Sequence, residues 1–199
     1  MTERPHPRKL ILVKHAEPII EPQVPPNRWG LSERGEARSV ALAERLRRYR
    51  PAAIVASEER KAVQTAHVVA ERLGMFAATV PGLHEHDRTA APFGTQAQFE
   101  LAAKVFFENP GKPVWGTETA EEARGRFADA VDGVLNRHPA GDVVVVAHGT
   151  VITLFLSRFV DLDAFAFWRG LGLPSLCVLG LPGYGLSEVV THLADASDD

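Results

Sequence analysis

Three short aliphatic runs, each followed at once or after one residue by polar side chains, constrain the fold of this chain more than any other feature. They lie at residues 10–13, 52–56 and 143–146. Aliphatic runs of this length, bounded by polar residues, are typical of strands that are covered on both faces, as in parallel sheets. Stretches with helical spacing separate them, and this alternation predicts an α/β fold with a mostly parallel central sheet.

The predicted helices have recognisable ends. Ser32 can cap a helix that Pro51 stops, and Gly74 ends a second helical pattern. Thr119 and Glu122 have the spacing of a capping box. We therefore expect helices at residues 32–50, 60–73, 120–137 and 150–160, with two further strands at 175–180 and 187–192.

A length of 199 residues suits a single domain, predicted to span residues 1–199. Residues 81–116 differ from the rest, because they hold four prolines and one short aromatic, helix-like piece at residues 99–107. We interpret this segment as a small lid inserted into the domain, and it is the expected source of substrate specificity.

Composition and charge exclude several classes of protein. The net charge is −3 and basic residues are not clustered, so we expect no nucleic-acid partner. Cys177 is the only cysteine, which rules out an internal disulfide bond and fits a reducing cytoplasm. The apolar run at residues 10–13 is too short for a membrane span or a secretion signal, so no membrane partner is expected. The oligomeric state stays open, with a dimer as one option.

The carboxyl ends of the three predicted strands carry the candidate chemistry. They present Lys14 and His15, then Arg60, then His148. In open parallel sheets, ligands bind beyond these ends. Two histidines and two cations suit a phosphate group, and a neutral imidazole is a good nucleophile near pH 7. A cation at Arg60, close to a helix N-terminus, also indicates a bound anion, because it otherwise opposes the helix dipole.

The chain resembles the histidine phosphatases, also called the phosphoglycerate mutase-like superfamily. Lys14-His15-Ala16 stands where that family has Arg-His-Gly, and His148-Gly149 matches its closing strand-His-Gly element. Residues 57–66 are similar to its Ser-x-x-x-Arg-Ala-x-Gln-Thr-Ala element, and residues 83–85 resemble the element with the catalytic glutamate. These elements occur in order over about residues 9–180. The resemblance implies a three-layer α/β/α domain.

The resemblance also implies a role for each candidate residue. His15 would accept the phosphoryl group as a phosphohistidine, and His148 would donate a hydrogen bond to it. Lys14, Arg60 and, less directly, Asn27 would bind phosphate oxygens. Glu85 would protonate the leaving oxygen and later activate water. The neighbours His84, His86 and Asp87 remain alternatives for this acid. Neither a metal nor a cofactor is required.

The hypothesis is therefore a metal-independent phosphomonoester hydrolase that acts on a small phosphorylated substrate. Lys14 and Ala16 depart from the family motif, and lysine cannot make the two-pronged contact of a guanidinium. Loss of one charge-assisted hydrogen bond costs about 1.5–3 kcal/mol. These departures keep open a non-catalytic or weakly active phosphate-binding domain. A phosphosugar mutase is disfavoured because dedicated mutases usually carry longer insertions.

Overall fold

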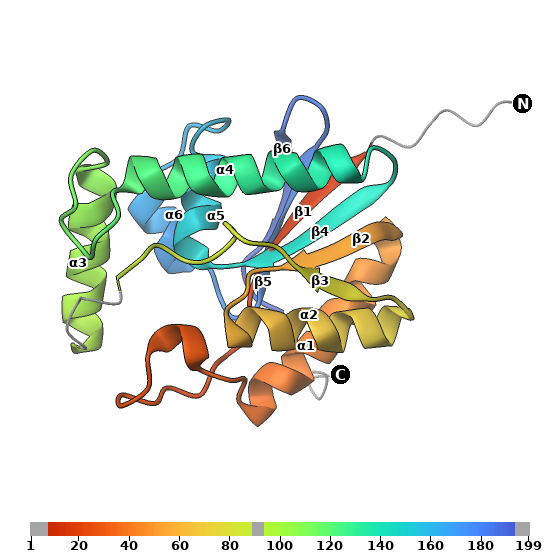
Figure 1. Ribbon diagram of the computed structural model, residues 1–199, viewed down its shortest axis with the longest axis horizontal. Helices are drawn as coiled ribbons and strands as arrows, with labels where there is room; N and C mark the ends of the chain where they lie inside the picture. Colours follow the sequence, from red (N-terminus) through yellow and green to blue (C-terminus); the bar gives the residue numbers. More distant parts are fainter. Residues whose placement is uncertain (1–7, 89–93, 194–199) are drawn as a thin grey trace, which may run out of the picture.

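The computed structural model describes residues 8–88 and 94–193, which form one six-stranded sheet with helices on both faces (Figure 1). The order of the strands in the sheet is β3-β2-β4-β1-β5-β6. The strands are β1 (Lys9–Lys14), β2 (Pro51–Ala56), β3 (Ala77–Thr79), β4 (Asp142–Ala147), β5 (Ser175–Gly180) and β6 (Gly185–Val190). β1, β2, β3 and β4 pair in parallel, whereas β5 and β6 pair antiparallel.

Six α-helices occur in the described residues. They are α1 (Glu33–Leu46), α2 (Arg60–Leu73), α3 (Gln96–Glu108), α4 (Ala120–Arg137), α5 (Gly149–Leu156) and α6 (Ala164–Gly170). Two 3-10 turns lie at Pro26–Arg28 and Arg47–Tyr49. Figure 1 shows α4, α5 and α6 on one side of the sheet, α1 and α2 on the other, and α3 at one end of the molecule.

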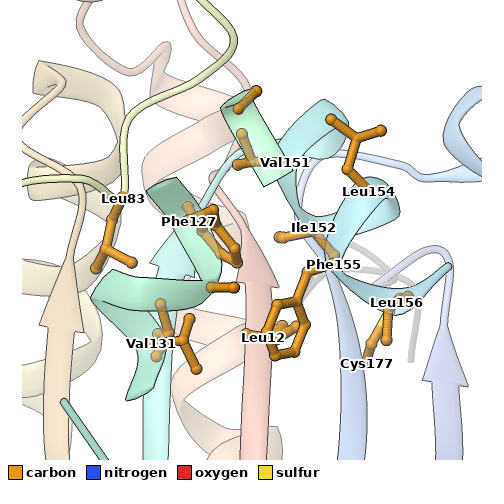
Figure 2. Packing of buried hydrophobic residues seen from close by; sticks show 14 of the residues in the cluster. Leu12, Leu83, Phe127, Val131, Val151, Ile152, Leu154, Phe155, Leu156 and Cys177 are labelled. Carbon is orange, nitrogen blue, oxygen red and sulfur yellow. The ribbon is translucent and has the colours of Figure 1, made fainter. Parts of the chain in front are cut away.

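The strand residues alternate between two hydrophobic cores. Leu12 and Val145 belong to the core beneath α4 and α5, which Figure 2 shows with Phe127 and Phe155 against the sheet. Val13 and Val146 belong to the opposite core beneath α1 and α2. Such alternation follows from the two-residue period of a strand. β4 is buried along its whole length because it lies at the centre of the sheet.

The predicted three-layer α/β/α fold with a mostly parallel sheet is confirmed. The expected helices at 60–73 and 120–137 have the bounds of α2 and α4. The capping residues act as expected, since Ser32 accepts from the Gly35 amide and Thr119 forms a capping box with Glu122. Within the described ranges, no helix is long and apolar enough to cross a membrane.

Pairing between neighbouring strands continues past their ends and brings the polar residues together. The His15 amide donates to the Ala147 carbonyl at 3.0 Å, next to His148. The Ser57 amide donates to the Val146 carbonyl at 2.9 Å. β4 therefore lies between β1 and β2, and the residues that follow all three strands meet at one edge of the sheet.

Candidate active site

His15 is held so that one ring nitrogen is left without a proton. Its Nδ1 lies 2.7 Å from the Ala16 carbonyl oxygen, which can only accept a hydrogen bond, so Nδ1 carries the proton. The Nε2 of a neutral ring then keeps its lone pair. Burial, with smaller contributions from His148 and Lys61, holds the pKa of His15 well below its usual value of 6.5. The ring is therefore neutral at pH 7, with the Nε2 lone pair available.

His148 lies against His15 and is fully buried. The two ring centroids are 5.2 Å apart, with the planes inclined at 62°. Nε2 of His148 lies 2.8 Å from Ser57 Oγ and 3.5 Å from a carboxylate oxygen of Glu59. Burial lowers the pKa of His148 to about 4, although Glu59 acts in the opposite direction. Both imidazoles are thus neutral in the free protein.

Lys14 precedes His15 in the chain, and the main chain fixes its ammonium group. Nζ donates to the Leu171 carbonyl at 2.7 Å. The stem of Lys14 packs so closely on Gly149 that a Cβ added there would lie 3.2 Å from Lys14 Cε. Burial lowers the pKa of Lys14 to about 8, with Glu85 opposing and Arg88 adding to the shift. Lys14 therefore carries its charge at pH 7 and loses it a little above.

The second buried cation is Lys61, a residue that the sequence reasoning passed over in favour of Arg60. Lys61 is 6% exposed, and its Nζ donates to the Pro26 carbonyl at 2.8 Å and to Glu59 at 2.5 Å. The side chain of Arg60 is exposed and lies beside Gly30 and Gln64. Counting the family element from Ser57 places Lys61, not Arg60, at the arginine, and this was the signal available in the sequence.

Glu59 was also not predicted, yet it connects the buried groups. Its Oε1 accepts the Glu85 amide at 2.8 Å and faces His148, while its Oε2 binds Lys61. Burial raises the pKa of Glu59, but His148 and Lys61 outweigh it and hold the pKa far below the usual range. The carboxylate is therefore ionised and offsets the charge of Lys61.

Glu85 lies at the N-terminus of α5, next to His148. Its carboxylate accepts from the amides of Thr150 at 3.2 Å, Val151 at 3.3 Å and His86 at 2.9 Å. Burial raises the pKa of Glu85, but Arg88, His148 and the His86 amide bring it below its ordinary value. The free protein therefore holds Glu85 as a carboxylate.

The chain neighbours of Glu85, namely His84, His86 and Asp87, differ in their burial and contacts. His86 is buried, with its Nε2 2.9 Å from the Glu118 carbonyl and its ring centroid 4.1 Å from that of Phe106. Asp87 accepts from the Thr117 hydroxyl at 3.1 Å. His84 is half-buried and lines a cavity with Glu85. Among these four residues, Glu85 is the one that also lines the cavity at His15.

Two cavities that share part of their lining open beside these groups, and His148 lines neither of them. One, of about 630 Å³, is lined by Lys14, His15, Lys61 and Glu85, with the rings of Trp29, Phe99 and Trp168 as walls. The other, of about 650 Å³, is lined by Asn27, Arg60 and His84, and shares Lys61, Glu85 and Arg88 with the first. The structure thus places Asn27 and Arg60 outside the cavity that His15 lines. Both volumes lie in the range of small-ligand sites.

Ala16, the other departure from the family motif, fits its position without strain. It does not adopt a positive φ, its side chain is fully buried, and its amide donates to Thr65 Oγ1 at 3.0 Å. Alanine therefore costs no backbone strain here. Within residues 8–88 and 94–193, no group of three or more His, Cys, Asp or Glu side chains is placed to hold a metal ion.

The strand topology thus brings His15, His148, Lys14 and Lys61 together at one edge of the sheet. The family model of the histidine phosphatase superfamily (branch 1) matches residues 10–193, and the chain belongs to this superfamily.

Individual relatives are phosphatases. Glucosyl-3-phosphoglycerate phosphatase of Mycobacterium tuberculosis is 27% identical over 194 residues, covering 84% of this chain and 77% of the relative. The solved mycobacterial glucosyl-3-phosphoglycerate phosphatase with inorganic phosphate has a TM-score of 0.70 and 25% identity, covering 95% of this chain and 98% of that chain. Phosphoserine phosphatase of Entamoeba histolytica with 3-phosphoglyceric acid shares the fold, with a TM-score of 0.75, 17% identity and coverage of 93% and 98%.

Proposed function

We propose that this protein is a phosphomonoester hydrolase that works through a phosphohistidine at His15. The observation that carries the proposal is the hydrogen bond of His15 Nδ1 to the Ala16 carbonyl, at 2.7 Å, in a ring whose pKa is lowered by burial. This hydrogen bond supports an unprotonated Nε2 on His15, which lines a cavity together with Lys14 and Lys61. The phosphatase relatives support the same class of reaction.

In the first step, Nε2 of His15 attacks phosphorus, and the bond from phosphorus to the ester oxygen breaks. Lys14 and Lys61 stabilise the charge on the phosphoryl oxygens, as fixed cations do in phosphoryl transfer. His148 donates from Nε2 to one of these oxygens. Glu85 gives its proton to the leaving alcohol. The phosphate dianion of the bound substrate raises the pKa of Glu85, because added negative charge raises the pKa of a neighbouring carboxyl group. Glu85 is therefore protonated when the substrate is bound.

In the second step, water attacks the phosphohistidine. Glu85, now a carboxylate, accepts a proton from this water while the phosphorus–nitrogen bond breaks and inorganic phosphate forms. The amides of Thr150 and Val151 hold the carboxylate at the helix N-terminus and keep it oriented toward the reacting group. In this mechanism side chains provide the positive charge, and neither a metal nor a cofactor takes part. The substrate partner is a small phosphorylated molecule.

Residues 81–116 supply part of the wall around this reaction. Phe99, on α3, lines the cavity of the nucleophile and lies 5.6 Å from Trp168 between ring centroids. We propose that the described part of this insertion acts as a lid within a single domain. Its aromatic side chains then exclude water from the phosphoryl group during the first step.

The test is hydrolysis of a generic aryl phosphate by the wild type and by His15→Ala. Turnover by the wild type that is lost in the variant supports the proposal. Transfer of phosphate between positions of phosphoglycerate without net release supports a mutase instead. Equal turnover by both proteins refutes a role of His15 as nucleophile.

A specific observation favours one second candidate, a phosphate-binding domain with weak or no activity. Glu59 already binds Lys61 and lies 3.5 Å from His148 Nε2, so a phosphate oxygen must compete with a carboxylate for both groups. Saturable phosphate binding without turnover, measured by calorimetry on the wild type, distinguishes this candidate from a hydrolase.

A further inference from the structure

Glu59 is a buried carboxylate that lies among the groups proposed to bind phosphate, and the proposed reaction does not use it. Its side chain is 11% exposed and lines the cavity beside the one that His15 lines. Oε2 accepts from Lys61 Nζ at 2.5 Å, and Oε1 lies 3.5 Å from His148 Nε2. A carboxylate in this position repels the anion that Lys61 and His148 would bind.

Two contacts hold the Glu59 carboxylate in place when a phosphate enters the site. Oε1 accepts from the Glu85 amide at 2.8 Å, and Oε2 forms the ion pair with Lys61. Turning the carboxylate toward solvent would leave the Glu85 amide without its acceptor and Lys61 without its partner, and both losses are unfavourable. Glu59 therefore stays in the site together with the bound phosphate.

Lys61 connects Glu59 to the cavity at His15. An ammonium group has three N–H donors. In Lys61, two of them are taken by the Pro26 carbonyl at 2.8 Å and by Glu59. One donor remains for a phosphate oxygen in the cavity that Lys61 shares with Lys14 and His15. A bound phosphate and Glu59 therefore share one positive charge, and each weakens the attraction of the other to it.

The Nε2–H group of His148 is shared in the same way. Nε2 lies 2.8 Å from Ser57 Oγ and 3.5 Å from Glu59 Oε1. Glu59 is the charged one of these two acceptors, and charged acceptors form the stronger hydrogen bonds. The carboxylate therefore competes with a phosphate oxygen for the single proton that His148 can donate from Nε2.

We propose that Glu59 weakens the binding of phosphate at this site, and so favours release of inorganic phosphate, the second product. This inference rests on the proposed function for the place of the phosphate, next to His15. Substrate and product both carry the phosphate group, so Glu59 weakens the binding of both. Tighter binding of the substrate would not speed the chemical step, whereas tighter binding of the product would inhibit turnover. Glu59 acts through Lys61 and His148, and no bond is made or broken at its carboxylate.

The experiment measures inorganic phosphate on the wild type and on Glu59→Gln. Glutamine removes the charge and keeps an oxygen that can accept from the Glu85 amide. The two quantities are Kd from calorimetry and the inhibition constant of phosphate against aryl phosphate hydrolysis. We expect both to fall by about tenfold to a hundredfold in the variant, because Lys61 regains one charge-assisted hydrogen bond to phosphate. A merely structural role of Glu59 predicts the opposite change, since a loosened site binds phosphate more weakly.

Glu58→Gln is the matched control, because Glu58 is exposed and lines the same cavity as Glu59. It removes the same charge one residue away and should change the phosphate affinity by less than about twofold, since solvent screens an exposed charge. If Glu59→Gln does not fold by circular dichroism, Glu59→Asp decides the question. Its shorter side chain withdraws the carboxylate from Lys61 and should tighten phosphate binding to a smaller extent.

A phosphate affinity that is unchanged or weaker in the folded Glu59 variant overturns the inference, and so does an equal gain in Glu58→Gln. A wild type that does not hydrolyse aryl phosphate refutes the proposed function alone, since the calorimetric comparison needs no turnover.

Discussion

Replacing Glu59 by alanine should destabilise the protein far more than removing an ordinary surface carboxylate. Glu59 and Lys61 form an ion pair in which the two side chains are 11% and 7% exposed. The Glu59→Ala change leaves the Lys61 ammonium buried without its partner, and it also removes the acceptor for the Glu85 amide. In the unfolded chain Glu59 and Lys61 do not form this buried pair. The substitution therefore raises the free energy of the folded state alone.

Breaking a buried ion pair from one side costs about 3–5 kcal/mol. Because this pair lines a cavity that admits water, we expect the lower end, about 3 kcal/mol. For a chain of this length, that corresponds to a fall in Tm of roughly 6–12 °C. Adding Lys61→Met to Glu59→Ala should recover much of the loss, since no lone charge then remains buried.

The assay is urea unfolding at several pH values, with Glu44→Ala as the control. Glu44 pairs with Arg47 at 2.8 Å, but both side chains are more than half exposed, so its loss should cost at most about 1 kcal/mol. The pKa of Glu59 is held below 4.5 in the folded state, so its contribution is present above that pH and is lost as the pH falls further. Equal losses in Glu59→Ala and Glu44→Ala, or a loss that does not shrink in acid, would refute this reasoning.

Three further predictions concern the site and the core. Because burial lowers the pKa of Lys14 to about 8, kcat/KM should decline as the pH rises through 8, and Lys14→Arg should remove that decline; an unchanged alkaline limb would contradict this. Gly149→Ala should raise KM roughly tenfold with little change in Tm, because the new Cβ would lie 3.2 Å from Lys14 Cε; an unaltered KM would contradict it. Phe127→Ala should lower the free energy of unfolding by about 3–5 kcal/mol in a denaturant titration, since Phe127 is fully buried, whereas Phe76→Ala, at 97% exposed, should change it by less than about 0.5 kcal/mol; similar losses for both would contradict it.

The fold was predictable where one local signal was strong. α2 ends at Gly74, which adopts a positive φ of 67° as a helix C-cap, and α4 begins at a capping box. β3 was missed because it has three residues at the edge of the sheet, two of them alanine, and α6 because it has only seven residues. Elements this short are stabilised by their neighbours and not by their own pattern.

The part of the site that could be predicted consists of residues that directly follow the strands of the sheet. His15 and His148 follow neighbouring parallel strands, so the topology alone brings them together. Lys61 was missed because the arginine next to it has the better chemistry for phosphate, although the spacing of the family element from Ser57 points to Lys61. In the structure Lys61 is buried and Arg60 is exposed. Glu59 had no signal of its own, since its role depends on contacts between segments far apart in the chain.

The most direct test of the account is to trap the phosphorylated protein. Wild-type protein mixed with a labelled phosphomonoester and quenched in base within the first turnover should carry an acid-labile phosphoryl group, which peptide mapping should place on His15. His15→Ala should carry none. A protein that turns over substrate without any such label, or with the label on another residue, would contradict the central claim.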